Sequence, residues 1–249
     1  MKLQLIRNAT LRLIYGQHQI LIDPYLAPKH SLPSFTGKSL NPLADLPCTP
    51  EEAIAGSELV IVSHLHADHF DGVAQTLLPK NIELFCQPGD EAAIGGKGFE
   101  QVTAVSEPTA WHDITITPTP CQHGSGEVLA LMGNASGFIF AAENEPTVFW
   151  VGDSILTHDI LEIINRIQPD IIITHSCGAV WGDGVLIVMD AAQTTAVCQA
   201  APKSTVIATH MESLDHATIT RPVLRQHAAA QGIGSEQLLI PADGETLAF

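Results

Sequence analysis

Short apolar segments alternate with polar turns along the whole chain. The first part predicts three successive strands, Leu3–Arg7, Thr10–Tyr15 and Gln19–Ile22, with a hairpin turn at Tyr15–His18 and an end at Asp23-Pro24. Strands joined by such short turns pair antiparallel. This opening meander therefore argues against a purely parallel, doubly wound sheet.

Strands and helices are predicted in alternation over most of the remaining chain. The predicted strands are Glu58–Val62, Glu83–Gln87, Gln101–Val105, Asp113–Pro118, Gly137–Ala142, Thr147–Val151, Asp170–Thr174, Thr205–Thr209, Leu238–Ile240 and Thr246–Phe249. The predicted helices are Phe70–Leu78, Asp90–Ile94, Leu156–Ile167, Asp190–Ala200 and Arg221–Gln231. This order predicts an α/β fold with two sheets and outer helices, in a single domain over residues 1–249.

Residues 24–50 interrupt this pattern. They contain six prolines, at positions 24, 28, 33, 42, 47 and 50, and show little periodicity. A loop of this length is uncommon in a compact domain and often serves as a lid or binding loop; a passive surface excursion is the alternative. Regular structure is expected to resume at Thr49, where Thr49-Pro50-Glu51-Glu52 matches a helix capping box.

Composition and charge narrow the class of protein. The 249 residues are 45% hydrophobic, which is ordinary for a globular protein, and the net charge is −16. A chain with this negative charge repels the phosphate backbone of nucleic acids, which disfavours a nucleic-acid partner. Apolar runs are too short for a membrane span or a secretory signal, and the five cysteines are scattered without a C-x-x-C pair. We expect a cytoplasmic protein without disulfides or a membrane partner.

The segment Ser63–His69 carries the strongest chemical signal. It follows a predicted strand and places His64, His66, Asp68 and His69 within six residues. Neutral imidazole and carboxylate groups are good ligands for zinc and related ions. His64 and His66 lie two apart, so an extended chain points both to one side, and a turn can bring Asp68 and His69 toward a second ion. A polar loop satisfied without metal is the alternative.

Two neighbouring ions need further ligands, and three candidates lie at the ends of predicted strands. They are His123 in Cys121-Gln-His-Gly124, Asp153 in Val151-Gly-Asp-Ser154, and His210 in Ala208-Thr-His210. Gly152 is expected to permit a close backbone approach beside Asp153.

The series H-x-H-x-D-H, lone His, G-D-S and T-H resembles the metallo-β-lactamase superfamily over essentially the whole chain. Ile20-Leu-Ile-Asp23-Pro24 and Met189-Asp190 also resemble its ascorbate-6-phosphate lactonase-like branch. The resemblance implies a four-layer αββα sandwich of two mixed sheets. It also implies one metal held by His64, His66 and His123, another held by Asp68, His69 and His210, and Asp153 between them.

The implied activity is hydrolysis of a small ester, lactone or phosphoester by a hydroxide shared between two divalent ions. Zinc is the expected metal, and manganese is the second choice. Asp68 is a candidate proton carrier as well as a ligand, and His175 and His216 are candidate substrate contacts. A glyoxalase-II-like thioesterase and a catalytically idle metal- or metabolite-binding sensor are the alternatives. The resemblance is also compatible with a homo-oligomer.

Two departures from other branches narrow the activity further. His66 stands where the flavodiiron branch has Glu, which argues against oxygen or nitric oxide reduction. Asp153 stands where certain zinc β-lactamases have a cysteine ligand, which argues against antibiotic hydrolysis of that type.

Overall fold

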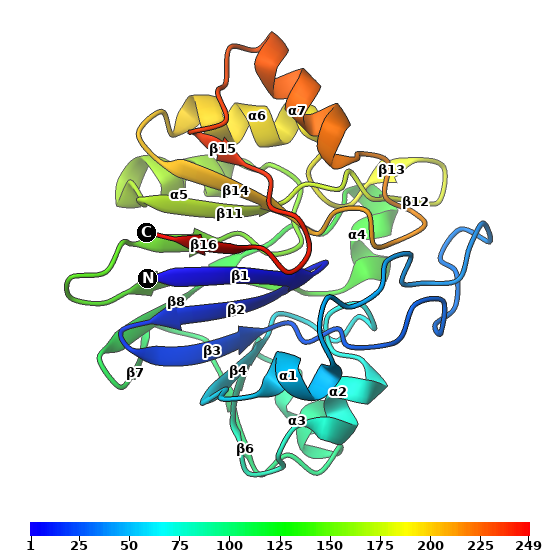
Figure 1. Cartoon of the computed structure of the whole chain (residues 1–249), viewed down its shortest axis with the longest axis vertical. Coiled ribbons are helices and arrows are strands. Elements are labelled where there is room, and N and C mark those ends of the chain that lie inside the picture. The colour runs from blue at the N-terminus through cyan, green and yellow to red at the C-terminus, as the bar shows by residue number, and fades with distance from the viewer.

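Two seven-stranded sheets pack face to face in the computed structural model, which describes residues 1–249 (Figure 1). The first sheet has the order β16-β1-β2-β3-β4-β5-β6. Its strands are β1 (Lys2–Arg7), β2 (Thr10–Tyr15), β3 (His18–Ile22), β4 (Leu59–Val62), β5 (Glu83–Cys86), β6 (Gln101–Ala104) and β16 (Thr246–Ala248). Pairing is antiparallel from β16 to β3 and parallel from β3 to β6. The predicted opening meander is therefore confirmed.

The second sheet is also mixed, with the order β15-β14-β11-β10-β9-β8-β7. Its strands are β7 (Thr109–Trp111), β8 (Ile114–Pro120), β9 (Ser136–Ala141), β10 (Val148–Trp150), β11 (Ile171–His175), β14 (Thr205–Thr209) and β15 (Leu238–Leu239). The strands from β15 to β10 are parallel and those from β10 to β7 antiparallel. A separate small hairpin pairs β12 (Val180–Trp181) with β13 (Val185–Leu186).

Helices form the two outer layers. Beside the first sheet lie α1 (Pro50–Ile54), α2 (Gly72–Leu77) and α3 (Glu91–Gly95), and beside the second lie α5 (His158–Ile167), α6 (Ala191–Ala200) and α7 (Arg221–Ala230) (Figure 1). α4 (Gly126–Met132) lies at one end of the sandwich. This arrangement confirms the predicted αββα sandwich. No helix is both long enough and apolar enough to cross a bilayer.

Strand β4 shows how the sequence places the sheets. Leu59 and Ile61 join the core between the two sheets, whereas Val60 and Val62 pack under the helices of the outer layer. Because both of its faces are buried, β4 is a continuous apolar run with no polar alternation. The two hydrophobic layers fix the end of β4, and the histidine motif follows directly.

Several elements differ from the sequence prediction. The helix expected from Phe70 begins at Gly72, because the side chain of Asp71 accepts a hydrogen bond from the backbone N–H of Ala74 and caps it. β7, α4, β12 and β13 were not predicted, since each is short and lacks a clear period. The capping box at Thr49 is confirmed. The 24–50 segment has no helix or strand before α1, apart from an isolated bridge between Leu32 and Asn41.

Candidate metal centre

The seven predicted ligands lie together where strands of both sheets end. His64, His66, Asp68 and His69 follow β4, and His123 follows β8. Asp153 follows β10, and His210 follows β14. Parallel strands β4, β10 and β14 bring their carboxyl ends to the same side of the sandwich, so residues far apart in the chain converge there.

Asp153 lies at the middle of this cluster. Its Oδ2 lies 3.9 Å from His64 Nε2, 3.3 Å from His69 Nε2 and 3.4 Å from His123 Nε2. Its Oδ1 lies 3.7 Å from His210 Nε2. Gly152 has φ +72°, and a Cβ there would lie 3.0 Å from the Ser136 carbonyl oxygen, so only glycine allows this approach of the chain.

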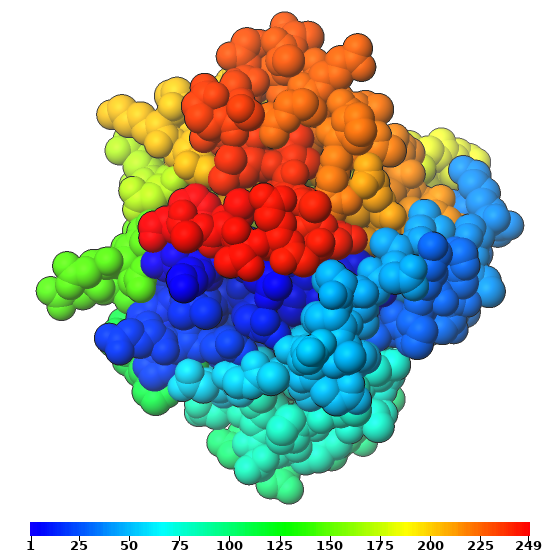
Figure 2. Space-filling model, in the orientation of Figure 1, coloured from blue at the N-terminus to red at the C-terminus, as the bar shows by residue number.

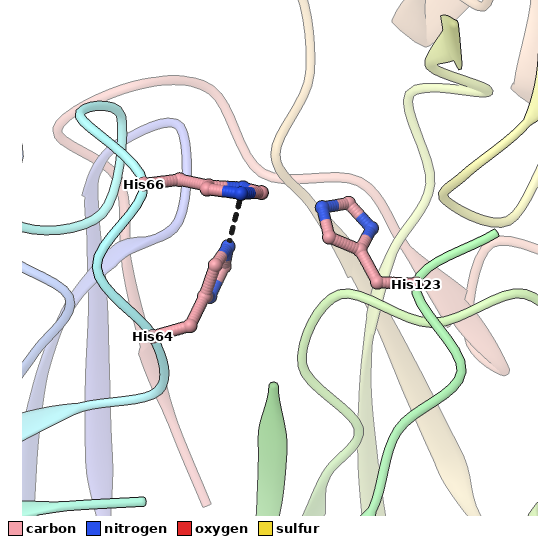
Figure 3. Close-up of side chains that lie close together, drawn as sticks. All are labelled: His64, His66 and His123. Atoms are coloured by element: carbon pink, nitrogen blue, oxygen red, sulfur yellow. Dashed lines mark hydrogen bonds between the residues drawn. The ribbon is translucent and has the colours of Figure 1, made fainter. Parts of the chain in front are cut away.

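The first predicted trio is His64, His66 and His123, whose ligand atoms all lie within 4.8 Å of one another. Figure 3 shows the first two side chains projecting from the same loop and His123 facing them from another loop, the one that follows β8. His64 Nε2 and His66 Nδ1 are 2.9 Å apart. Two nitrogens bound to one tetrahedral zinc lie about 3.4 Å apart, so a small adjustment of these side chains would suit an ion.

Hydrogen bonds fix which nitrogen of each ring faces the centre. The Asp23 carboxylate can only accept, so His69 Nδ1, 2.7 Å away, is assigned the proton. The hydroxyl of Ser63 donates to Asp23 and accepts from His64 Nδ1 at 2.9 Å. His123 Nδ1 donates to the Ile187 carbonyl at 2.8 Å. In all three rings the lone pair of Nε2 then faces the centre, as metal-bound histidines require.

These lone pairs provide the test of whether an ion fits. Without an ion, Nε2 of His64 and of His123 would each face the Asp153 carboxylate, and two acceptors without a proton between them repel. A divalent cation among them removes that repulsion, because nitrogen and oxygen lone pairs are both its ligands. The donor set therefore fits a bound metal. Burial opposes a charge on His64 and lowers its pKa well below the ordinary value, which favours the neutral ligand form.

The second predicted trio is Asp68, His69 and His210, again with ligand atoms within 4.8 Å of one another. Asp68 Oδ2 lies 3.4 Å from His69 Nε2 and 3.2 Å from His210 Nε2. Burial alone would lower the pKa of His69, but Asp153, Asp68 and Asp23 hold it well above the ordinary value. These carboxylates thus attract positive charge strongly at this position. His210 has φ +62°, a strained conformation of the kind found at functional sites.

Of the two predicted substrate contacts, only His216 lines the cavity above the cluster. Its Nδ1 has no hydrogen-bond partner, and its ring packs edge-on against Phe35 at 4.8 Å between centroids. His175 is buried among the candidate ligands, with Nδ1 2.5 Å from Asp153 Oδ1 and its ring against Trp150. Burial lowers the pKa of His175 to about 4. In this position His175 is better placed to orient the Asp153 carboxylate than to contact a substrate.

The cavity has a volume of about 220 Å³. It is lined by Phe35, His66, Ala67, Asp68, His123, Leu131, Met132, Asp153, Trp181, Ile187 and His216. Candidate ligands form its polar part, and α4 and the β12–β13 hairpin supply apolar walls. The lining contains no Lys or Arg.

The 24–50 segment contributes Phe35 to this cavity, and its loop protrudes at the right of Figure 2. Asp215, next to His216, holds that part of the loop. Its carboxylate accepts from the backbone N–H of Phe35 at 3.0 Å and of Thr36 at 3.1 Å, from Asn41 Nδ2 at 3.0 Å, and from two hydroxyls. Burial opposes ionisation, but these donors hold the pKa of Asp215 well below its usual range.

We expect Asp215→Ala to weaken substrate binding more than chemistry. Without the carboxylate, the donors around Phe35 lose their shared acceptor and the cavity wall loosens. KM should rise about tenfold, equivalent to about 1.4 kcal/mol, with a smaller change in kcat. Steady-state kinetics would measure this, with the exposed Asp45→Ala in the same loop as the control. An equal KM in both variants would contradict the assignment.

Some residues of the site were not predicted. Asp23 was predicted only as the end of a strand and as part of a family resemblance, yet its carboxylate contacts Ser63 and His69. Asn8 donates to the Asp68 carbonyl at 3.1 Å, and Cys177 Sγ lies 3.4 Å from His210 Nδ1. The Asp23-Pro24 strand end was a usable signal for the first. Asn8 has none, because only long-range packing brings it here, whereas Cys177 had one in its position just after a predicted strand end, before a glycine-rich loop.

Fold and site together define a metal-dependent hydrolase of the metallo-β-lactamase type, and the comparisons agree. The family model for the beta-lactamase superfamily domain matches residues 18–211, and the chain belongs to this superfamily. The UPF0173 protein YddR of Bacillus subtilis is 34% identical over the full length of both chains.

Two solved structures are also similar along the chain. The isothiocyanate hydrolase from Delia radicum gut bacteria is 35% identical with a TM-score of 0.93, over 100% of this chain and 99% of that one. A possible metal-dependent hydrolase from Veillonella parvula is 33% identical with a TM-score of 0.95, over the same shares of the two chains.

Proposed function

We propose that the chain forms one catalytic domain that holds two divalent ions and hydrolyses a small, uncharged substrate. His64, His66 and His123 would hold one ion, Asp68, His69 and His210 the other, and Asp153 would lie between them. The nitrogen-rich donor set favours zinc, with manganese as the second choice. The observation that supports this proposal most directly is that the Nε2 lone pairs of His64 and His123 both face the Asp153 carboxylate.

When bound, such ions supply a water-derived nucleophile at neutral pH and polarise the group under attack. The remaining work falls to the chain. His175, which is hydrogen-bonded to Asp153 Oδ1, holds that carboxylate in position. Asp68 lines the cavity and can carry a proton to the leaving group. His216, whose ring lines the cavity, can contact the substrate.

The cavity lining indicates the substrate class. Phosphorylated substrates are usually held by Arg or Lys, and neither lines the cavity. Phe35, Leu131 and Trp181 instead offer apolar contacts to a small side group. A neutral ester or lactone fits this lining better than a phosphoester. An isothiocyanate is a second candidate, because it is also small, neutral and electrophilic at carbon, and the isothiocyanate hydrolase resembles this chain over its full length.

A substrate panel would test the proposal. Metal-loaded protein should hydrolyse neutral lactones, esters or isothiocyanates with kcat/KM at least about 10²-fold above that for phosphorylated analogues, because the cavity lacks a cationic partner worth about 3 kcal/mol. A thioester tests the glyoxalase-II-like alternative. Preference for the phosphorylated compounds would contradict the assigned substrate class. Absence of turnover with every compound and every metal would favour the other alternative, a catalytically idle metal- or metabolite-binding sensor.

A further inference from the structure

A second group of metal-binding side chains lies at the opposite end of the sandwich. His18 begins β3, Glu58 directly precedes β4, and His112 lies in the turn between β7 and β8. Each offers one ligand atom, and the three atoms lie within 4.8 Å of one another. Strands β3, β4 and β8 all run from this end toward the candidate centre. Along β4 the separation is roughly 20 Å, at about 3.3 Å per residue.

The three side chains are already arranged around a common point. The rings of His18 and His112 stack with centroids 4.2 Å apart and planes 12° apart. His18 Nδ1 lies 2.9 Å from Glu58 Oε2, and the other oxygen of Glu58 accepts from the backbone N–H of Gln19 at 3.0 Å. The Glu58 carboxylate is thus fixed by the backbone of β3, and it faces the histidine pair.

The surroundings of His18 also resemble those of a metal ligand. A histidine that binds metal through one nitrogen usually presents the other N–H to a carboxylate. On the side away from Glu58, His18 Nε2 has the Asp113 carboxylate nearby, with Oδ1 at 3.7 Å, which is an electrostatic contact longer than a hydrogen bond. Gly16, with φ +55°, leaves room for this carboxylate, because a Cβ there would lie 3.1 Å from Asp113 Oδ1.

We propose that His18, Glu58 and His112 form a structural site for one divalent transition-metal ion of the zinc type, separate from the catalytic centre. Two imidazole nitrogens and one carboxylate oxygen are a suitable donor set, and the partial exposure of the residues leaves the fourth position to water. His18 begins β3 and Glu58 precedes β4, both strands of the first sheet, whereas His112 lies in the turn between β7 and β8 of the second. A bound ion would therefore connect the two sheets and stabilise the folded chain, since only folding brings the ligands together.

Zinc binding by the untagged, full-length protein would test this site. After its catalytic centre is loaded, the wild type should bind one more equivalent of Zn²⁺ than His112→Ala or Glu58→Gln. The rise in Tm on adding Zn²⁺ should disappear in both variants, with kcat unchanged. His158→Ala is the matched control, because His158 on α5 also faces a glutamate, Glu162 at 3.4 Å, but belongs to no three-ligand group.

Equal zinc stoichiometry and an equal rise in Tm in the wild type and both variants would overturn the proposal. Glu58→Gln keeps an acceptor for the Gln19 N–H, so it remains informative if His112→Ala folds poorly. The test compares only how many equivalents of Zn²⁺ the wild type and the variants bind, and the expected difference is one. If that difference were absent, the catalytic proposal would be unaffected, whatever the number of ions in the catalytic centre.

Discussion

Replacing Asp153 with alanine should reduce turnover at least about 10³-fold on every substrate and release metal from both predicted positions. Asp153 lies within 3.3–3.9 Å of a nitrogen of four histidines, and no other carboxylate reaches both trios. Bound metal supplies several kcal/mol of transition-state stabilisation, and about 4 kcal/mol corresponds to about 10³-fold in rate. Elemental analysis and kinetics on the same preparation would measure both effects.

The matched control for this variant is Asp159→Ala. Asp159 is an exposed carboxylate in the first turn of α5, close to Asp153 in the chain but outside the cluster. It should keep the metal content and turnover of the wild type. If Asp153→Ala retained both its metal and its activity, the two-ion arrangement would be wrong. Loss of activity with full metal content would instead restrict Asp153 to a role in chemistry.

The fold was predictable because its signals are local. Strand β4 is a uniform apolar run, β14 has a short apolar run between two threonines, and α5 shows helical spacing ahead of Pro169. Short elements escaped prediction. α4 has only 7 residues, begins at Gly126 and ends before Gly133, and the strands of the β12–β13 hairpin have 2 residues each, so neither shows a full period. Their positions depend on the packing around the cavity.

The candidate ligands were predictable for a different reason. The cluster His64–His69 is dense in the sequence, and His123, Asp153 and His210 each follow the end of a strand. The orienting contacts were not predictable, because they join distant positions. Asp215 contacts Asn41 across 174 residues, and Asn8 contacts Asp68 across 60. Only the folded sheets bring such pairs together.

Asp23→Asn should weaken metal binding about 10–100-fold, although Asp23 is not a predicted ligand. Its buried carboxylate accepts from the backbone N–H of Ser63, from the hydroxyl of Ser63 and from His69 Nδ1, each at 2.7 Å. Through these contacts it orients His69 directly and His64 through Ser63. An amide is nearly isosteric but presents N–H to one of these donors, so a ring is expected to turn or change tautomer.

Asp71→Asn separates this effect from general instability. Asp71 is also buried, and its carboxylate accepts from the backbone N–H of Leu26, Ala27 and Ala74, but it contacts no predicted ligand. Both variants should lower Tm, because each leaves buried donors without a good acceptor. Only Asp23→Asn should also speed metal loss to a chelator and lower kcat at subsaturating metal. Equal chelation rates in the two variants would show that Asp23 stabilises the fold without tuning the centre.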